Sequence, residues 1–337
     1  MNEKNGNLIE IKNLKVEYRT DMETVSAVNN IDIAIGHGKT LGLVGETGAG
    51  KTTTALSILR LLPERTGFIE DGEILFDGED ILKADECTMQ HIRGNRISMV
   101  FQDPMTSLNP VLTVGDQIAE AIRLHNEHLT KEEVEQKVEE TLMMVGILPQ
   151  RKIEYPHQFS GGMKQRVVIA IALCCEPELL IADEPTTALD VTIQAQVLSM
   201  MRELRDRLGT SMLLITHDLG VIAEMADYVY VMYAGKVVES GTVQEIFKDP
   251  LHPYTVGLQK SKPVVGKEVR ELYSIPGQVP NPINMPDYCY FKERCDRCVA
   301  DCAGAYPEFV WVTPTHGVAC HRYTEGGKKN ERRYRGL

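Results

Sequence analysis

The chain has 337 residues, of which 43% are hydrophobic and 25% are charged, as expected for a globular protein with a sizeable core. Its 48 acidic and 36 basic residues give a formal charge of −12, which argues against broad nucleic-acid binding because neutralising phosphates needs a basic face. The first residues contain no apolar signal core, and the longest apolar run, 167–175, is far shorter than the about 20 residues of a membrane span. We therefore expect a soluble, cytosolic protein that reaches a membrane only through a partner.

Short apolar segments indicate the strands of a sheet. Several are continuously apolar, as strands buried on both faces should be. In chain order the segments are 8–11, 31–35, 41–44, 97–101, 179–182, 212–215 and 229–233. Helical patterns separate the later ones, so the sequence predicts an α/β core.

A glycine-rich loop, GETGAGKT at 45–52, follows the third predicted strand and fits the phosphate-binding pattern G-x-x-x-x-G-K-[ST] at every fixed position. The segment 53–62 then has a helical pattern that Pro63 would end. In this context backbone N–H groups can wrap a phosphate at a helix N-terminus, Lys51 can reach the β- and γ-phosphates, and Thr52 can bind Mg²⁺. The predicted ATP-binding residues of the loop are Gly45, Gly48, Ala49, Gly50, Lys51, Thr52 and Thr53.

A helical insertion interrupts the core at about 102–166. Thr130 and Glu133 have the spacing of a capping box at a helix start. Apolar side chains then recur on one helical face, at Val134, Val138, Leu142 and Val145. We therefore expect a helical subdomain in this region.

Two carboxylates, Asp183 and Glu184, end the strand predicted at 179–182. The carboxyl end of a strand is where an α/β sheet places its ligands. Asp183 is suited to hold Mg²⁺ through a water, and Glu184 is suited to polarise the water that attacks the γ-phosphorus. A chance acidic pair at a strand end is the alternative.

A second anion-binding pattern, FSGGMKQ at 159–165, places a serine and two glycines at the start of a helix. With GETGAGKT, Gln102, LLIADE, Asp190 and His217, this segment makes residues 8 to about 245 resemble the ATP-binding subunit of an ABC transporter. The resemblance implies a P-loop ABC-type ATPase in which the signature of one subunit faces the phosphate loop of another, so that two ATP molecules are sandwiched in a dimer. Because the chain carries one loop and one signature, the resemblance implies a partner ATPase.

The same resemblance assigns roles to single residues. It implies that Gln102 contacts Mg²⁺ and senses the γ-phosphate, that Asp190 lies in a loop crossing the dimer interface, and that His217 holds the γ-phosphate. Tyr18 matches the aromatic residue that lies against adenine, with ordinary edge packing as the alternative. The signature residues expected to contact the nucleotide of the facing subunit are Ser160, Gly161, Gly162 and Gln165.

Three further segments narrow the resemblance to oligopeptide and dipeptide importers, a group that includes nickel importers: 101–110, 155–166 and 252–258. It implies an ATPase domain at 1–250 and a proline- and cysteine-rich extension at 251–337. It further implies a heterodimer of related ATPases at the cytoplasmic face of the cell membrane, two permease subunits and an external solute-binding protein. Import of di- or oligopeptides is the expected function, with nickel import as the alternative. A soluble ABC ATPase acting on DNA or ribosomes fits less well, because the chain is acidic and has one cassette.

Five of the eight cysteines fall in this extension: Cys289, Cys295, Cys298, Cys302 and Cys320. A disulfide framework is unusual in a cytosolic protein, and scattered inert thiols are a second interpretation. Structural zinc is favoured by the Cys295-x2-Cys298 spacing, with His316 or His321 as further ligands. An iron–sulfur cluster suits four thiolates in a proline-stiffened loop, and a redox-sensing tail is another alternative.

The importer group's cysteine pattern aligns with Cys289, Cys295, Cys302 and Cys320 and leaves Cys298 as an extra. The resemblance therefore implies a [4Fe–4S] cluster on the aligned four, with Zn²⁺ as the alternative. The basic segment 328–337 is expected to be a solvated end, with contact to an anionic membrane surface as the alternative.

Overall fold

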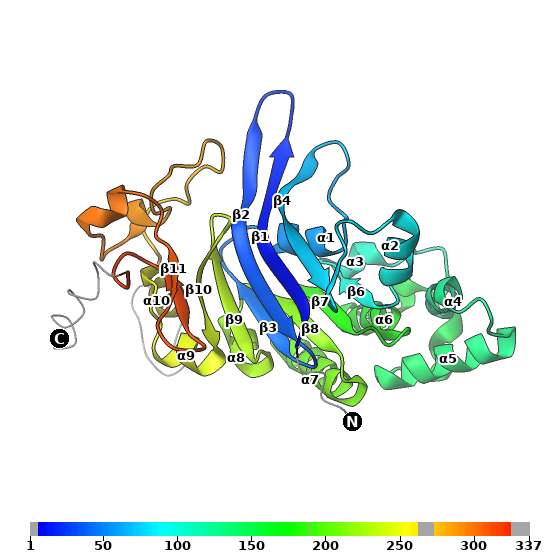
Figure 1. Ribbon diagram of the computed structural model, residues 1–337. Coiled ribbons are helices and arrows are strands. Elements are labelled where there is room, and N and C mark those ends of the chain that lie inside the picture. The colour runs from blue at the N-terminus through cyan, green and yellow to red at the C-terminus, as the bar shows by residue number, and fades with distance from the viewer. Residues whose placement is uncertain (1–5, 188, 262–272, 325–337) are drawn as a thin grey trace. The chain divides into compact units, whose positions relative to one another are not determined.

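The computed structural model describes residues 6–187, 189–261 and 273–324 (Figure 1). These residues divide into two compact units. Described residues within Met1–Glu10, Ala34–Thr40 and Leu75–Thr216 belong to the first unit, and those within Ile11–Ile33, Leu41–Ile74 and His217–Leu337 belong to the second. The predicted basic segment 328–337 lies outside the described residues.

Three parallel strands form the sheet of the first unit, in the order β8 (Ser211–Ile215), β7 (Leu179–Asp183) and β6 (Ile97–Val100). Every residue of β7 and β8 is buried, which explains why their sequences are apolar without alternation. Asp183, the last residue of β7, pairs with Ile215, the last residue of β8. Polar residues that follow these strands therefore emerge at one edge of the sheet.

The helices of the first unit include those expected between about residues 102 and 166. The helices of this unit are α2 (Glu86–Ile92), α3 (Pro104–Ser107), α4 (Val114–His125), α5 (Lys131–Met144), η1 (Pro149–Ile153), η2 (Pro156–Gln158), α6 (Gly161–Leu173) and α7 (Val191–Leu208). The capping box of Thr130 and Glu133 opens α5 as predicted, and Val134, Val138 and Leu142 are buried. Figure 1 shows α4 and α5 side by side.

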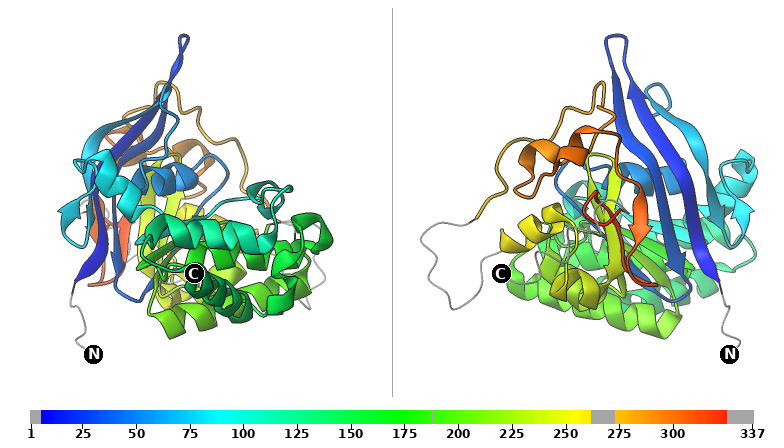
Figure 2. Two further views of the ribbon diagram at one scale, coloured as in Figure 1. Left: turned by 90° about the vertical axis from the view of Figure 1, so that its right-hand side faces the viewer. Right: turned by 60° about the vertical axis from the view of Figure 1, so that its left-hand side comes forward.

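The second unit orders its strands as β11 (Phe309–Trp311), β12 (Gly317–Ala319), β10 (Lys236–Thr242), β9 (Tyr228–Tyr233) and β3 (Thr40–Val44). The pair β3–β9 is parallel, whereas β9–β10, β10–β12 and β11–β12 are antiparallel. Figure 2 shows the orange-red strands of the C-terminal extension beside the yellow-green β10. The extension therefore continues the sheet that contains β3, the strand before the phosphate loop.

The helices of the second unit are α1 (Lys51–Ile58), α8 (Leu219–Met225), α9 (Val243–Lys248), α10 (Pro253–Lys260), η3 (Lys292–Arg294) and η4 (Ala300–Ala303). A further set of strands has the order β2 (Thr24–Gly36), β1 (Asn7–Arg19), β4 (Gly67–Phe76) and β5 (Glu79–Asp80). Among the described helices, none combines the length and the apolar character that crossing a membrane requires.

The predicted α/β core is confirmed, and each of the seven predicted segments lies in a strand or extends it by one residue. The helix predicted at 53–62 is displaced: α1 begins at Lys51 and ends at Ile58. Arg60 has a φ of 52°, a left-handed conformation that ends the helix before Pro63 is reached. The proposed domain boundaries at 250/251 remain a prediction.

Candidate functional site

The phosphate loop connects β3, which is buried throughout, to α1. Gly50 caps α1 with a φ of 96°. A Cβ at this position would lie 2.5 Å from the carbonyl oxygen of Ala27, so a side chain cannot be accommodated. The strand, glycine loop and helix predicted from the sequence are therefore all present, and glycine is required where the helix begins.

Lys51 folds back over its own loop. Its Nζ donates hydrogen bonds to the carbonyl oxygens of Gly45 (2.8 Å) and Glu46 (3.0 Å), and only 8% of the residue is exposed. An ammonium group has three donors that rotate freely, so it can exchange a carbonyl partner for a phosphate oxygen. The loop thus holds a positive charge at the start of a helix, where a phosphate is bound most readily.

The predicted nucleotide contacts Thr52, Tyr18 and His217 also belong to the second unit. Thr52 is exposed, and the hydroxyl of the half-buried Tyr18 lies 3.3 Å from Oγ1 of Thr53. This hydrogen bond brings Tyr18, the predicted adenine contact, to the first turn of α1. His217 is exposed, and the next residue, Asp218, caps α8.

The first unit places Gln102 directly against Glu184. The Gln102 Nε2 donates a hydrogen bond of 3.1 Å to Oε2 of Glu184, and Oγ1 of Thr187 donates another of 3.0 Å to the same oxygen. Asp183, which precedes Glu184 at the end of β7, is buried. The structure therefore brings together three residues predicted for Mg²⁺ and water activation.

The backbone at Glu184 is unusual. Its φ of 48° is left-handed, which is uncommon for a residue with a side chain. Its N–H donates to the carbonyl of Ile215 (2.8 Å), and the side chain accepts the two hydrogen bonds described above. Such strain persists where surrounding contacts fix the residue, and it occurs often at functional sites. Sequence reasoning did not identify Thr187, whose only signal was its position three residues after Glu184.

Two helix starts carry the signature and the predicted interface loop. Ser160 caps α6 by accepting from the N–H of Met163 (3.4 Å), and Asp190 caps α7 by accepting from the N–H of Ile193 (2.9 Å). A Cβ on Gly162 would lie 2.3 Å from Cγ2 of Ile193, so this glycine lets α6 approach α7. Ser160 and Asp190 are thus fixed next to exposed N–H groups of two neighbouring helices.

Gln165 differs from the other signature residues. Its side chain is completely buried, and neither its Oε1 nor its Nε2 has a hydrogen-bond partner among the described residues. A buried amide without partners is costly. The buried position of the Gln165 side chain therefore does not favour contact with a nucleotide, and that contact remains a prediction.

The predicted nucleotide residues thus fall into two groups. One group in the second unit contains the phosphate loop, Tyr18 and His217. The other group, in the first unit, contains Gln102, Asp183, Glu184, the signature and Asp190.

The cysteines of the extension lie near one another. Cys289, Cys302 and Cys320 are buried, Cys295 is half-buried and Cys298 is exposed. The pKa of Cys289 is raised to about 12 and that of Cys295 to about 11, mainly by burial and to a smaller extent by neighbouring cysteines. The four aligned thiols therefore lie within electrostatic range of each other. Within residues 6–261 and 273–324, apart from 188, no three or more histidine, cysteine or acidic side chains are arranged to hold a metal ion.

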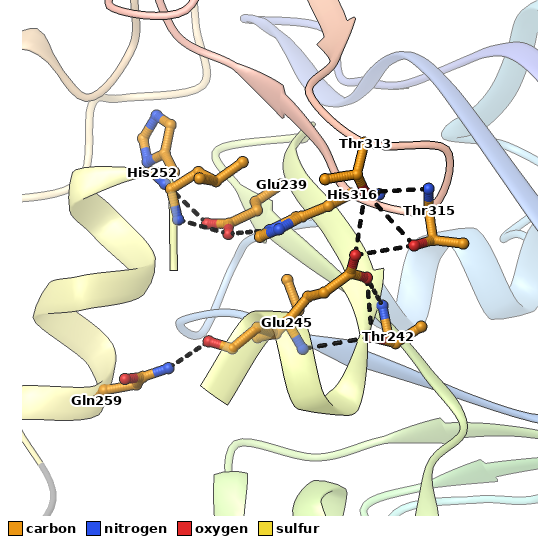
Figure 3. A network of polar contacts seen from close by, with 10 residues as sticks. Glu239, Thr242, Glu245, His252, Gln259, Thr313, Thr315 and His316 are labelled. Atoms are coloured by element: carbon orange, nitrogen blue, oxygen red, sulfur yellow. Dashed lines mark hydrogen bonds and ion pairs between the residues drawn. The ribbon is translucent and has the colours of Figure 1, made fainter. Parts of the chain in front are cut away.

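The two histidines considered as zinc ligands have other partners. His316 Nε2 lies 2.8 Å from Oε1 of Glu239, and His321 Nε2 lies 3.0 Å from the carbonyl oxygen of Ala305. Figure 3 shows Glu239 between His252 and His316. The carboxylate also accepts from the N–H groups of Leu251 (2.7 Å) and His252 (2.8 Å), so it fastens the extension to β10.

The chain matches two protein families. Residues 28–187 match the ABC transporter family, and residues 238–302 match the oligopeptide/dipeptide transporter, C-terminal region. The oligopeptide transport ATP-binding protein AppD of Bacillus subtilis is 49% identical over 322 residues, covering 95% of this chain and 98% of that protein. The dipeptide transport ATP-binding protein DppD of Lactococcus lactis is 48% identical over 312 residues, covering 92% of this chain and 89% of that protein.

Solved structures share the fold. A dimeric ATP-binding cassette in a post-hydrolysis state, bound to ADP and Pi, superposes with a TM-score of 0.63 at 26% identity, covering 70% of this chain and 98% of that one. The cbiO1 protein of Clostridium perfringens, part of the ABC transporter complex cbiONQ, superposes with a TM-score of 0.62 at 28% identity. The match covers 75% of this chain and 95% of the cbiO1 chain.

Proposed function

Because the chain belongs to the ATP-binding proteins of the ABC transporter family, we propose that it hydrolyses ATP to drive the import of di- or oligopeptides through a membrane transporter. One observation carries the proposal: relatives named for oligopeptide and dipeptide transport match the cassette and the C-terminal region together, over more than nine-tenths of the chain. We propose residues 1–250 as the ATPase domain and 251–337 as the importer-specific extension. Nickel remains the alternative solute, since the solute does not contact this subunit.

The proposed mechanism assigns one task to each side chain around the ATP phosphates. Lys51 exchanges its carbonyl partners for the β- and γ-phosphate oxygens, and loop N–H groups hold the phosphates at the start of α1. Tyr18 lies against the adenine, and His217 contacts the γ-phosphate. Glu184 accepts a proton from the attacking water and so raises its nucleophilicity.

Thr52, Gln102 and Asp183 are the proposed Mg²⁺ ligands, Asp183 through a water. They supply hydroxyl, amide and carboxylate oxygens, the ligands that Mg²⁺ prefers. When bound, Mg²⁺ neutralises charge that builds up on the phosphate oxygens. Asp183 ends β7 at the carboxyl edge of the sheet, the position at which an α/β sheet binds its ligands, and this position supports the assignment.

A second ATPase subunit completes the proposed site. Ser160, Gly161 and Gly162 would bind the γ-phosphate held by the loop of the facing subunit, with Asp190 at the interface. The exposed start of α6 supports this role, because its N–H groups are directed outward from a capped helix. We propose a related second ATPase, two permease subunits and, indirectly, a solute-binding protein as partners, with the chain peripheral at the cytoplasmic face of the membrane.

We also propose that Cys289, Cys295, Cys302 and Cys320 hold a [4Fe–4S] cluster, with zinc as the alternative. Electrostatic effects between the thiols support this grouping, but they also involve Cys298, so the choice of the aligned four rests on the resemblance to the importer group. A cluster is larger than a single ion, so its thiolates need not converge on one point.

Copurification from native membranes tests the transport assignment. An affinity-tagged chain is extracted in mild detergent, and the copurifying proteins are identified by mass spectrometry. We expect two permeases and a second ATPase, and we expect added peptide with its solute-binding protein to raise ATP hydrolysis. Stimulation by nickel but not by peptide would favour the alternative solute. Recovery with DNA-processing proteins or ribosomes, and without permeases, would contradict both importer assignments.

A further inference from the structure

Arg294 of the C-terminal extension pairs with Glu46 of the phosphate loop, 248 residues earlier in the chain and within the same unit. Its Nη1 donates to Oε2 of Glu46 (2.7 Å), and its Nη2 donates to Oε1 (3.1 Å). This is the two-point geometry that fits a guanidinium to a carboxylate. The Arg294 side chain is 5% exposed and the Glu46 side chain 29% exposed, so water screens the pair only partly.

The remaining donors of Arg294 fix the guanidinium in place. Its Nε donates to the carbonyl oxygen of Pro276 (3.1 Å), its Nη2 also to that of Ile275 (3.3 Å), and its Nη1 also to the hydroxyl of Tyr233 (3.3 Å). Hydrogen bonding to Glu46 is the main reason that the pKa of Arg294 is raised above its ordinary value. The side chain therefore remains charged, and the extension and β9 hold it towards the loop.

Glu46 is held at three points. Its N–H donates to the hydroxyl of Tyr254 (2.8 Å), its carbonyl oxygen accepts from Lys51 Nζ (3.0 Å), and its carboxylate accepts from Arg294. Two of these anchors come from residues after 250. The position of the second residue of the phosphate loop is thus set by the region that follows the cassette.

An aromatic cluster supports these anchors. The rings of Tyr233 and Tyr254 lie 4.7 Å apart between centroids, and Phe291 lies 5.2 Å from Tyr233 and 5.5 Å from Tyr254. Phe291 directly precedes η3, the short helix that ends at Arg294. The packing therefore fixes both Tyr254 and the helix that carries Arg294.

We propose that Arg294 is a positioning residue for ATP binding: it holds Glu46 and thereby the loop on which Lys51 and the phosphates meet. The inference rests on the proposed role of residues 45–52 as the ATP site. A loop already fixed in its binding conformation loses less conformational freedom when the phosphate binds. Without Arg294 the loop retains more freedom, so ATP affinity falls although no residue contacting ATP has changed.

Coupling between two sites is reciprocal. If Arg294 favours the loop conformation that binds ATP, then bound ATP must in turn favour the paired position of Arg294. ATP should therefore slow amide hydrogen exchange in residues 288–303, and this protection should depend on Arg294.

The test measures the affinity of the full-length, anaerobically purified chain for Mg-ATP by calorimetry. We expect Arg294→Met to raise Kd about tenfold or more, the size of a lost 1.4 kcal/mol. Arg294→Lys should recover part of the affinity, because an ammonium keeps the charge but not the two-point geometry. Glu46→Gln should weaken binding similarly, and the double variant should be no weaker than the more affected single variant.

His316→Gln is the matched control. It alters another buried contact between the extension and a carboxylate, that of His316 with Glu239, and changes no residue of the phosphate loop. It should lower thermal stability without changing Kd. Lys51→Ala tests the premise by itself, because this variant should lose ATP binding if residues 45–52 form the ATP site.

The inference would be overturned, and the assigned ATP site kept, by the following result. Lys51→Ala loses ATP binding, whereas Arg294→Met and Glu46→Gln keep the wild-type Kd and the wild-type exchange protection. Unchanged binding in Lys51→Ala would overturn the assigned site and the inference with it. If Arg294→Met does not fold, Arg294→Lys and Glu46→Gln still decide the result. An equal rise of Kd in His316→Gln would show a general effect of loosening the extension and would also overturn the role of Arg294.

Discussion

The side-chain amide of Gln102 donates a 3.1 Å hydrogen bond to the carboxylate of Glu184, although 82 residues separate them in the chain. The contact joins the residue proposed to sense the γ-phosphate to the residue proposed to activate water. Thr187 donates to the same oxygen, Oε2. Both donors bind the same oxygen, so the two hydrogen bonds together fix the orientation of the Glu184 carboxylate.

Glu184→Gln should nearly abolish hydrolysis and leave ATP binding intact. The amide keeps the size of the side chain but cannot accept the proton of the attacking water, and general-base catalysis of this kind contributes about 10²–10⁴-fold. Steady-state phosphate release measures hydrolysis and calorimetry measures ATP binding, both on the same preparation. Turnover at the wild-type rate would remove Glu184 from this role.

The isolated chain should be a monomer or weak dimer with low ATPase activity. Ser160 cannot complete the site of its own chain, so the facing signature must come from another subunit. Specific activity should rise with protein concentration and rise further when the second ATPase and the permeases are added. High activity that does not change with dilution would contradict the two-subunit mechanism.

His252 should make folding stability depend on pH. Burial lowers the pKa of this histidine to about 4, an effect that the nearby Glu239 partly opposes. Its Nδ1 accepts a hydrogen bond from the N–H of Tyr254 (3.1 Å), which only an unprotonated nitrogen can do. The folded pKa lies below the unfolded value near 6.5, so the unfolded state takes up the proton first. Stability is therefore full above about pH 6.5 and is lost between 6.5 and 4, by about 3 kcal/mol in all.

Denaturant titrations of the wild type and His252→Asn at pH 7.5, 6 and 5 measure this loss. Asparagine keeps an acceptor at the start of α10 but does not titrate, so the variant should lose less stability as the pH falls. Glu245 titrates in a lower window: burial alone would raise its pKa, but hydrogen bonds from Thr242, Thr315 and Thr313 lower it to about 2. An identical pH dependence in both proteins would contradict the assignment to His252.

The sequence predicted the elements whose local pattern is strong. Continuous apolar runs identified β3, β7 and β8, because strands buried on both faces need no polar positions. The position at a strand end also identified Glu184, whereas Gln102 was assigned by the resemblance to ABC transporter subunits. The sequence missed β4 and β10, whose half-exposed or polar residues lack a clear alternation.

Contacts between distant segments were not predictable. Nothing in the sequence near Arg294 points to Glu46, because the pair depends on how the extension returns to the phosphate loop. The end of α1 was misplaced for a related reason: the left-handed Arg60 depends on its surroundings, whereas Pro63 was visible in the sequence. The burial of Gln165 likewise reflects packing that a short motif does not contain.

The extension should hold an iron–sulfur cluster on Cys289, Cys295, Cys302 and Cys320. Four thiolates saturate such a cluster, so we expect a structural role rather than catalysis. Iron and sulfide analysis after anaerobic purification, with a visible absorbance that bleaches on reduction, measures it. Cys320→Ser should lose the iron, whereas Cys298→Ser should keep it because Cys298 is exposed and lies outside the aligned four. Zinc without iron would favour the zinc site over the cluster, and protein free of both metals would contradict the presence of a metal centre.

Peptide uptake by reconstituted proteoliposomes tests the central claim most directly. The purified transporter, containing either the wild-type chain or Glu184→Gln, is supplied with its solute-binding protein, labelled peptides of two to five residues and ATP on the side of this chain. The account predicts that peptide accumulates inside against its gradient with the wild type and that Glu184→Gln binds ATP but transports none. Equal ATP-dependent uptake by both, or no peptide uptake by a wild-type complex that hydrolyses ATP, would contradict it.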